Sequence, residues 1–244
     1  MKILRLSILA LLAVPVVAAP AAAAPVVVPA PALVARYNFD GGAVAGRISE
    51  LSGRGGALTV RGANNGAVSF TTMGAGRFAA FPAPCAATAL TCAKALLEAP
   101  DDADLDPGTR SFRWAAAVRL TRAQLTGSAN VMQKGVATAG SQWKMQIGGP
   151  TGRAQCVMVG RGTAQTFAAL SAKPVIDGNW HRIVCQRTGT VLTISVDGVA
   201  GERVTVPAAL SVDNNLPLRV GGPNFARNAD MYHGQIDDVY AQLG

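Results

Sequence analysis

The sequence predicts an all-β fold, a two-sheet antiparallel β-sandwich forming one domain. Of its 244 residues, 50% are hydrophobic and only 15% are charged, which excludes a disordered chain. Glycine (27) and proline (14) recur along the whole length, as expected for short strands joined by tight turns. After residue 32, hydrophobic residues often take every second position, which places them on one face of a sheet.

Residues 1–23 have the features of a secretory signal peptide. A positively charged start, an apolar stretch and a tract of small residues follow one another, with Ala-x-Ala cleavage sites ending at Ala21 and Ala23. The apolar stretch is shorter than the roughly 20 residues that cross a bilayer. We therefore expect a secreted, extracellular protein without membrane insertion, in which a Pro/Ala-rich tail at 24–32 precedes a domain at 33–244.

The expected strands follow one another along this domain. Alternating segments occur at Leu33–Phe39, Phe112–Leu120, Trp143–Ile147, Leu192–Val196 and Leu216–Val220. Asp197-Gly198 predicts the clearest hairpin turn, because both residues tolerate positive φ. The one hint of helical spacing is Ala86–Leu97. The irregular stretch Pro82–Gly108 is expected to be an insertion and not a domain boundary.

The four cysteines are expected to form two disulfides in an oxidising compartment. Four cysteines allow three pairings. We favour Cys85–Cys92, closing a short loop, and Cys156–Cys185, linking two strands. Metal ligation is disfavoured because the sequence has no Cys-x-x-Cys and its two histidines lie far from both pairs.

The basic character of the chain does not indicate a nucleic-acid partner. The formal charge is +8, and removing Lys2 and Arg5 with the signal peptide leaves +6. A basic surface attracts polyanions. The basic residues are scattered singly, however, without the run or stripe typical of nucleic-acid binding.

Two motifs carry a family resemblance. The segments Asp177-Gly-Asn-Trp-His-Arg-Ile-Val-Cys185 and Val191-Leu-Thr-Ile-Ser-Val-Asp-Gly198 resemble the "D-G-x-W-H-x-V … L-x-V-D-G" signature of laminin G-like domains, members of the concanavalin A-like lectin/glucanase superfamily. Tyr37–Asp40 and Gly234–Tyr240 resemble the opening and closing strands of that family. The resemblance covers residues 33–243 and implies a jelly-roll sandwich whose terminal strands pair.

The resemblance also implies roles for single residues. Trp180 is expected to bury its indole against the facing sheet with its N–H bonded, and His181 to be a structural histidine more than a ligand-binding one. Many relatives hold one structural calcium ion through carboxylate and backbone oxygens. Asp40 and Asp237 are the candidate ligands, although a turn-stabilising or edge-protecting role is an equal alternative. Glu50, where relatives often have Asp, weakens the calcium inference at that loop.

No catalytic residues are expected. Glycanases with this fold use two carboxylates facing one cleft. Glu50, Glu98 and Glu202 lie apart, and the acidic cluster at 101–106 lies in a loop where solvated or capping roles are expected. The only adjacent pair of the kind a polysaccharide lyase uses is Tyr232-His233.

The sequence therefore predicts a non-catalytic, lectin-like module that binds an extracellular glycan or glycosylated surface. Sugar rings stack on exposed aromatic side chains, and polar side chains bind the hydroxyls. The candidate ligand-binding residues are Trp143, Lys144, Asn224, Asp230, Tyr232 and His233. Two alternatives remain: a protein–protein or structural module without a sugar site, and a glycan-cleaving hydrolase or lyase.

Overall fold

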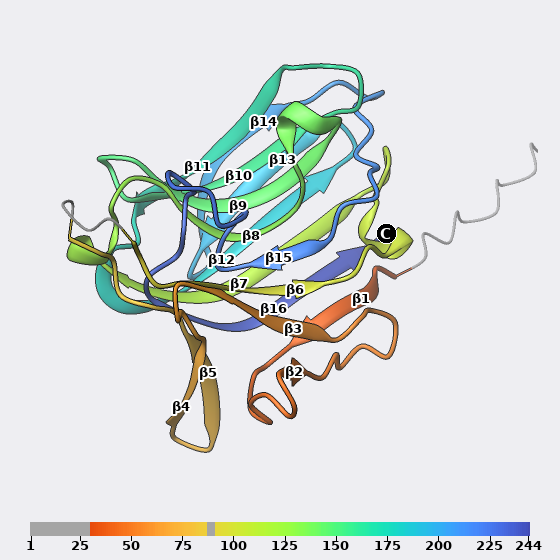
Figure 1. Cartoon of the computed structure of the whole chain (residues 1–244). Helices are drawn as coiled ribbons and strands as arrows, with labels where there is room; N and C mark the ends of the chain where they lie inside the picture. The colour runs from red at the N-terminus through yellow and green to blue at the C-terminus, as the bar shows by residue number, and fades with distance from the viewer. Residues whose placement is uncertain (1–29, 87–90) are drawn as a thin grey trace, which may run out of the picture.

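The predicted fold class is confirmed by the computed structural model, which describes residues 30–86 and 91–244. The described chain is almost entirely β-structure, arranged as two antiparallel sheets of eight strands each (Figure 1). Three short 3-10 helices join strands at Ala103–Leu105 (η1), Arg122–Gln124 (η2) and Ala137–Ala139 (η3). No helix of the described chain is both long and apolar enough to cross a membrane. The expected signal peptide lies outside the described residues.

The first sheet, called here the β7 sheet, has the order β14-β13-β12-β7-β16-β5-β4, with β1 also paired to β16. Its strands are β1 (Ala32–Tyr37), β4 (Ser69–Met73), β5 (Gly76–Ala80), β7 (Phe112–Thr121), β12 (Asp177–Thr188), β13 (Val191–Val196), β14 (Val199–Thr205) and β16 (Gln235–Leu243). The β4–β5 hairpin projects from the body of the sandwich (Figure 1).

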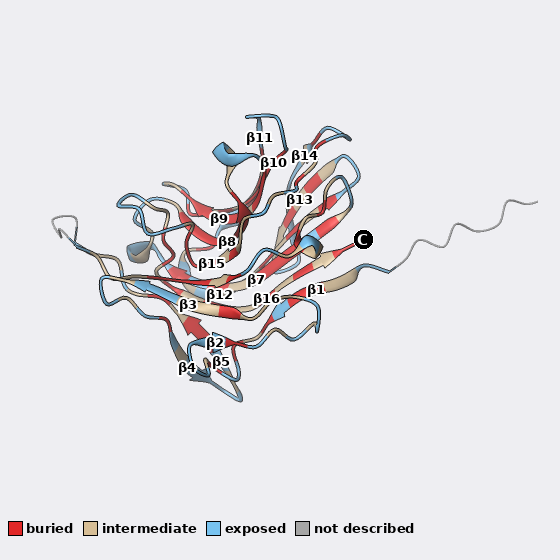
Figure 2. Ribbon diagram, turned by 45° about the vertical axis from the view of Figure 1, so that its right-hand side comes forward, coloured by how far each residue is buried: buried red, intermediate tan, exposed pale blue. Residues whose placement is uncertain are grey.

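The second sheet, called the β8 sheet, has the order β11-β10-β9-β8-β15-β6-β3-β2. Its strands are β2 (Arg47–Ile48), β3 (Leu58–Ala63), β6 (Lys94–Ala99), β8 (Ala129–Gly135), β9 (Gln142–Gly148), β10 (Arg153–Val159), β11 (Thr166–Pro174) and β15 (Leu218–Val220). Both sheets are curved, and buried residues concentrate on the strands where they face each other (Figure 2).

The core is formed by the inward positions of both sheets. Phe112 and Trp114 on β7 contact Trp143 on β9, with ring centroids 5.2 and 5.7 Å apart. All three rings are at most 1% exposed. Aromatic side chains bury the largest apolar areas, so this cluster contributes strongly to the association of the layers.

The predicted turn and terminal strand pairing are confirmed. Val196 pairs with Val199 across the hairpin, and Asp197 and Gly198 both have positive φ, 53° and 79°. β1 pairs with β16, with Tyr37 opposite Val239. The first and last described strands therefore lie side by side, which places both ends of the domain together (Figure 1).

Both predicted disulfides are present. Cys85 is bonded to Cys92, and Cys156 on β10 is bonded to Cys185 on β12. The second bond joins the two sheets through the core, where both cysteines are fully buried.

The expectations of an insertion at 82–108 and of helical spacing at Ala86–Leu97 were wrong. The strand β6 (Lys94–Ala99) begins within this stretch and pairs with β3 and β15 inside the β8 sheet. Ala95, Leu97 and Ala99 face the core. A second apolar residue at Leu96 interrupts the alternation, which explains the helical appearance of the sequence. The stretch is therefore an integral part of the sandwich.

The acidic cluster and a buried lysine form one polar group at the rim. As expected for a capping role, Asp102 accepts the N–H of Asp104 at the start of η1 (2.9 Å). Asp101 and Asp106, however, pair with the fully buried amine of Lys134, at 2.8 and 2.6 Å. Burial raises the pKa of Asp106 despite this lysine. The paired charges make this a structural group.

Arg187 is a second fully buried cation. Its guanidinium donates to the carbonyl oxygens of Gly189 (3.0 Å), Leu210 (2.5 Å) and Gly108 (3.3 Å). Burial lowers its pKa. These bonds fasten the β12 end to two loops, so this group also has a structural role.

Candidate ligand-binding groove

The candidate site lies on the outer face of the β8 sheet. Along β6, Lys94, Leu96 and Glu98 point away from the core because they alternate with core residues. Glu98 pairs in register with Arg219 on β15. The chain then leaves β15 through the loop 221–234 before entering β16 in the other sheet. Phe225 in this loop lines two hollows, of about 540 and 580 Å³. We call them together the Phe225 groove.

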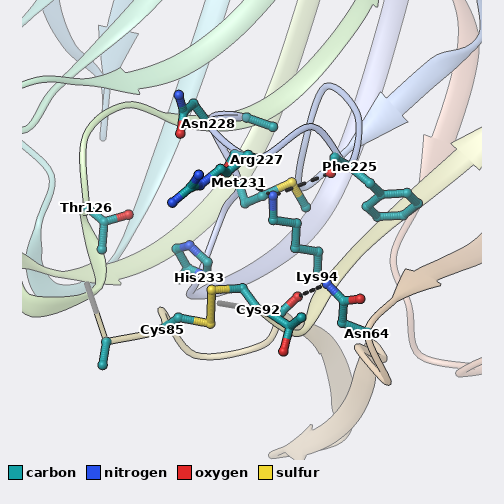
Figure 3. Close-up of a pocket in the computed structure, with 13 residues that line it drawn as sticks. Asn64, Cys85, Cys92, Lys94, Thr126, Phe225, Arg227, Asn228, Met231 and His233 are labelled. Carbon is teal, nitrogen blue, oxygen red and sulfur yellow. Dashed lines mark hydrogen bonds between the residues drawn. A yellow bond between two sulfur atoms is a disulfide. The ribbon is translucent and has the colours of Figure 1, made fainter. Parts of the chain in front are cut away.

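The first hollow lies between the 221–234 loop and the Cys85–Cys92 disulfide (Figure 3). Its lining is mostly polar, and the side chains that offer hydrogen-bonding groups are those of Asn64, Thr91, Lys94, Thr126, Arg227, Asn228 and His233. Ligand pockets typically have volumes of about 300–1,000 Å³, so the hollow is large enough for a small ligand.

The second hollow extends along the outer faces of β3, β6 and β15. Arg61, Glu98 and Arg219 line it together with Asn224 and Phe225. Arg61 donates through Nε and Nη2 to one oxygen of Glu98, at 3.2 and 3.1 Å, and Arg219 donates through Nε to the other at 2.9 Å. Glu98 is therefore held between two guanidinium groups.

The loop that carries Phe225 is fastened to the sheet beneath it. The amine of Lys94 donates to the carbonyl oxygens of Phe225 (3.5 Å), Ala226 and Arg227 (3.2 Å) (Figure 3). The side chain of Arg219 also donates to the carbonyl of Pro223. A loop ordered in advance loses less conformational entropy when it binds a ligand.

Phe225 is the one aromatic residue among the exposed large hydrophobic residues of the described chain, with 37% of its surface exposed. It lines both hollows. An exposed ring flanked by amide and charged side chains can stack against one face of a ligand while polar groups bind its edge.

The structure brings four of the predicted ligand-binding residues to this region. Asn224 lines the second hollow and His233 the first. Lys144 points outward from β9. Burial lowers the pKa of Lys144, and the carboxylate of Asp230 in the loop partly offsets this effect by favouring the charged amine. Lys144 and Asp230 line neither of the two hollows.

The expectation that Trp143 and Tyr232 are exposed was wrong. Both are fully buried. Trp143 takes an inward position of β9, and its Nε1–H donates to the carbonyl of Leu105 at 2.9 Å. The alternation that exposes Lys144 must bury its neighbour. The Tyr232 hydroxyl lies 3.1 Å from the carbonyl oxygens of Arg119 and Gln235, so this residue anchors the end of the loop.

His233 lines the first hollow as a neutral ring. Its Nδ1 lies 2.8 Å from the carbonyl oxygen of Pro82, to which it donates. Burial and the nearby charge of Lys94 lower the pKa of His233. The remaining ring nitrogen is therefore available as a hydrogen-bond acceptor at neutral pH.

The signature histidine has the predicted structural role. His181 Nδ1 lies 2.7 Å from Asp197 in the hairpin turn, and Nε2 lies 2.9 Å from Asp177. Burial opposes protonation, but these two aspartates outweigh it and raise the pKa of His181. The three signature residues fasten the start of β12 to the hairpin.

The expected placement of Trp180 was wrong. It faces outward from the β7 sheet, packing edge-on against Phe78 with ring centroids 5.5 Å apart. Its Nε1–H has no hydrogen-bond partner in the described structure. Asp177 pairs with Thr121, and Trp180 pairs with Arg119. Three positions along β12 therefore match two positions along β7, so β12 contains one extra residue between Asp177 and Trp180. This bulge places the side chain of Trp180 on the opposite face of the sheet from the one that simple alternation predicts.

The candidate calcium ligands lie close together. Burial, followed by the negative charges of Asp238 and Asp40, raises the pKa of Asp237 to about 6. Arg36 and Arg182 both pair with Asp238, at 3.5 and 2.6 Å. Asp40 and Asp237 form no ion pair with a basic side chain in the described chain. Such carboxylates fit the oxygen ligands that calcium prefers.

The rest of a calcium site would have to come from backbone or water oxygens. The described residues contain no cluster of three or more side chains suited to hold a metal. Asp40 accepts the N–H of Arg77 at 2.9 Å, a turn-stabilising contact. Glu50 accepts the N–H groups of Arg36, Ser52 and Gly53 at 2.7–2.8 Å, so its carboxylate is already used.

Comparisons with known proteins agree with this architecture. A family model described as the concanavalin A-like lectin/glucanases superfamily matches residues 94–241. The chain belongs to this superfamily. A search of curated proteins gives no significant match.

Solved structures with the same fold include a domain of an arabinanase and structures of bacterial toxins. Domain 4 of AbnA, an extracellular GH43 arabinanase from Geobacillus stearothermophilus solved with arabinotriose, has a TM-score of 0.67 at 16% identity over 88% of this chain and 93% of that one. A botulinum neurotoxin type C structure, described by its interaction with two ganglioside molecules, gives 0.61 at 8% identity over 86% of this chain. The binding domain of Paraclostridial Mosquitocidal Protein 1 gives 0.62 at 12% identity over 86%.

The extent of these matches differs. This chain spans about half the length of the two toxin chains, 47% and 48%, but nearly the whole of the arabinanase domain. At these low identities the likeness shows a common fold.

Proposed function

We propose that this protein is a secreted, non-catalytic module that binds an extracellular glycan in the Phe225 groove. The observation that carries the proposal is the exposed ring of Phe225 between two polar hollows. A sugar ring stacked on this side chain would place its hydroxyl groups within reach of amides and charged groups on both sides. The arabinotriose bound by the arabinanase domain and the gangliosides named for the neurotoxin make a glycan ligand plausible for this fold.

Binding without hydrolysis fits the charges in the groove. Glu98 is the single carboxylate among the described lining residues, and two arginines hold it. Hydrolysis requires a second carboxylate about 5–9.5 Å away. The lyase candidates Tyr232 and His233 are a buried anchor and a neutral ring bonded to the backbone.

A protein–protein module is the less favoured alternative. The exposed large hydrophobic residues of the described chain belong to different loops and strands: Val44, Leu51, Met73, Val199 and Phe225. Protein-binding surfaces are typically broad apolar patches.

Secretion fits the proposal because two disulfides require an oxidising compartment. One structural calcium ion at Asp40 and Asp237 is part of the same proposal. It would neutralise two clustered carboxylates and so fix the pairing of the terminal strands.

A glycan screen tests the proposed function. The mature protein, with and without calcium, is applied to immobilised neutral and acidic glycans beside Phe225→Ala. We expect binding to at least one glycan class by the native protein and a marked loss in the variant. Absence of binding in both conditions would reject the lectin function. Release of new reducing ends from a bound glycan would reject the non-catalytic assignment.

A further inference from the structure

The Phe225 groove has an excess of positive charge. Four cationic side chains line it: Arg61, Lys94, Arg219 and Arg227. Glu98 is the one carboxylate among the described lining residues. The groove therefore carries three more positive than negative charges.

In the second hollow, one carboxylate accepts hydrogen bonds from two guanidinium groups. Both oxygens of Glu98 are already occupied, by Arg61 and Arg219. Arg219 is half-buried and also holds the loop through Pro223, whereas the side chain of Arg61 is 56% exposed. Arg61 is thus the cation of this hollow that a ligand can reach.

On the first-hollow side, the positive charges have no carboxylate partner among the described residues. Lys94 donates to three backbone carbonyls, which satisfy its hydrogen bonds but carry no net charge. Arg227 is exposed, and its guanidinium makes no hydrogen bond or ion pair with the described residues (Figure 3). Arginine binds carboxylate and sulfate groups through two parallel N–H donors.

We propose that the Phe225 groove binds an anionic oligosaccharide, with a sugar ring on Phe225 and its carboxylate or sulfate groups on Arg227 and Arg61. This inference rests on the proposed function, and it adds the chemical class of the glycan. Arg227 lines the first hollow, Arg61 lines the second and Phe225 lines both, so a chain with acidic groups on successive sugars would satisfy both arginines. Neutral sugars would leave the charge excess of the groove uncompensated.

The test compares glycans of different charge, of which the acid and its methyl ester have the same sugar sequence. Binding to the mature protein is measured by calorimetry with an oligogalacturonate, the same oligosaccharide as its methyl ester, a chondroitin sulfate oligosaccharide and a neutral galacto-oligosaccharide. We expect the methyl ester to bind at least about tenfold more weakly than the free acid, as for loss of a charged hydrogen bond. Binding should also weaken between about 50 and 500 mM salt. The oligogalacturonate carries carboxylates alone, whereas chondroitin sulfate carries sulfate groups besides its uronate carboxylates, so tighter binding of chondroitin sulfate would assign a sulfate contact.

Matched arginine variants locate the effect. Arg227→Gln should weaken binding of the acidic glycan about tenfold, while Arg203→Gln on the exposed face of β14 should leave it unchanged. Both residues are exposed, and equal melting temperatures would show that both variants are folded.

Three outcomes would overturn the inference. If the ester or the neutral glycan binds as tightly as the acid, the inference fails while the proposed function stands. Single-stranded DNA that binds equally well and depends equally on Arg227 would show general polyanion binding. If no glycan of either charge binds, the proposed function fails with the inference.

Discussion

At the residue scale, Phe225 is the side chain on which the proposed site depends. Phe225→Ala removes the exposed ring, and we expect glycan affinity to fall about tenfold, or about 1.4 kcal/mol. Because the ring is exposed, the free energy of unfolding should change by less than about 0.5 kcal/mol. Calorimetry and urea unfolding measure the two effects.

Two variants serve as controls for this prediction. Val199→Ala removes an exposed hydrophobic residue on β14, in the other sheet, and should leave binding intact. Phe225→Trp should preserve binding because an aromatic face remains. Equal affinity of the native protein and Phe225→Ala would place the ligand elsewhere.

His181 gives a pH dependence of stability with a defined sign. Its pKa is raised in the folded protein, so its contribution is complete below the unfolded value of about 6.5 and is lost as pH rises through the folded pKa. Asp177, whose pKa is lowered to about 2, stays ionised throughout. We expect the stability difference between the native protein and His181→Gln to shrink as the pH rises above about 6.5 and passes through the raised pKa of His181. A constant difference in urea unfolding would contradict this role.

Single residues also mark the limit of the sequence analysis. The alternation around Trp143 and Lys144 predicted two faces correctly, but an alternating pattern does not say which face is buried. Lys144 is outward and Trp143 inward. Phe225, Arg61 and Arg219 were not predicted as site residues, because they become neighbours only when β3, β6 and β15 pair.

At the scale of elements, we expect loss of one disulfide to reduce mainly stability and loss of the other to reduce mainly glycan affinity. Replacing Cys156 and Cys185 by alanine removes the link between the sheets and should cost about 3–4 kcal/mol, as for a loop of about 30 residues. Replacing Cys85 and Cys92 by serine should cost less stability, because the loop is short. It should reduce glycan affinity, because both cysteines line the first hollow.

Urea unfolding and calorimetry on both double variants provide the comparison. Unchanged glycan binding after loss of Cys85–Cys92 would show that this wall of the hollow is not used.

Strands were predictable where their hydrophobic residues alternate strictly. The Asp197-Gly198 hairpin was predicted in detail, since its turn chemistry is local. β6 was missed because Leu96 and Leu97 are adjacent and the sheet context that buries Leu97 in the core is not local. The groove depends on β6, so the same error hid the site.

At the scale of the whole molecule, calcium should stabilise the paired ends of the domain. The pKa of Asp237 is about 3.9 in the unfolded chain and about 6 in the folded protein. Ionisation of this carboxyl therefore lowers the free energy of unfolding as the pH rises through this range. At pH 7 we expect calcium to raise the melting temperature of the native protein. Asp237→Asn should melt higher than the native protein in chelator and lose the response to calcium. No difference between calcium and chelator in the native protein would remove the ion from the proposal.

The global fold was the most predictable property, because period-two patterning and turn residues are distributed over the entire chain. Ligand identity was not, because the superfamily shares a framework and differs in its loops. The proposed site is formed by the 221–234 loop and the outward residues of three strands of the β8 sheet, and their arrangement follows only from the folded chain.

An NMR titration of the isotope-labelled mature protein with a bound oligosaccharide tests the location of the site most directly. We expect the amide shifts to concentrate around Asn64, Lys94 and the loop residues Phe225 and Arg227. Shifts gathered instead on the outward face of the β7 sheet, around Phe78 and Trp180, would contradict it.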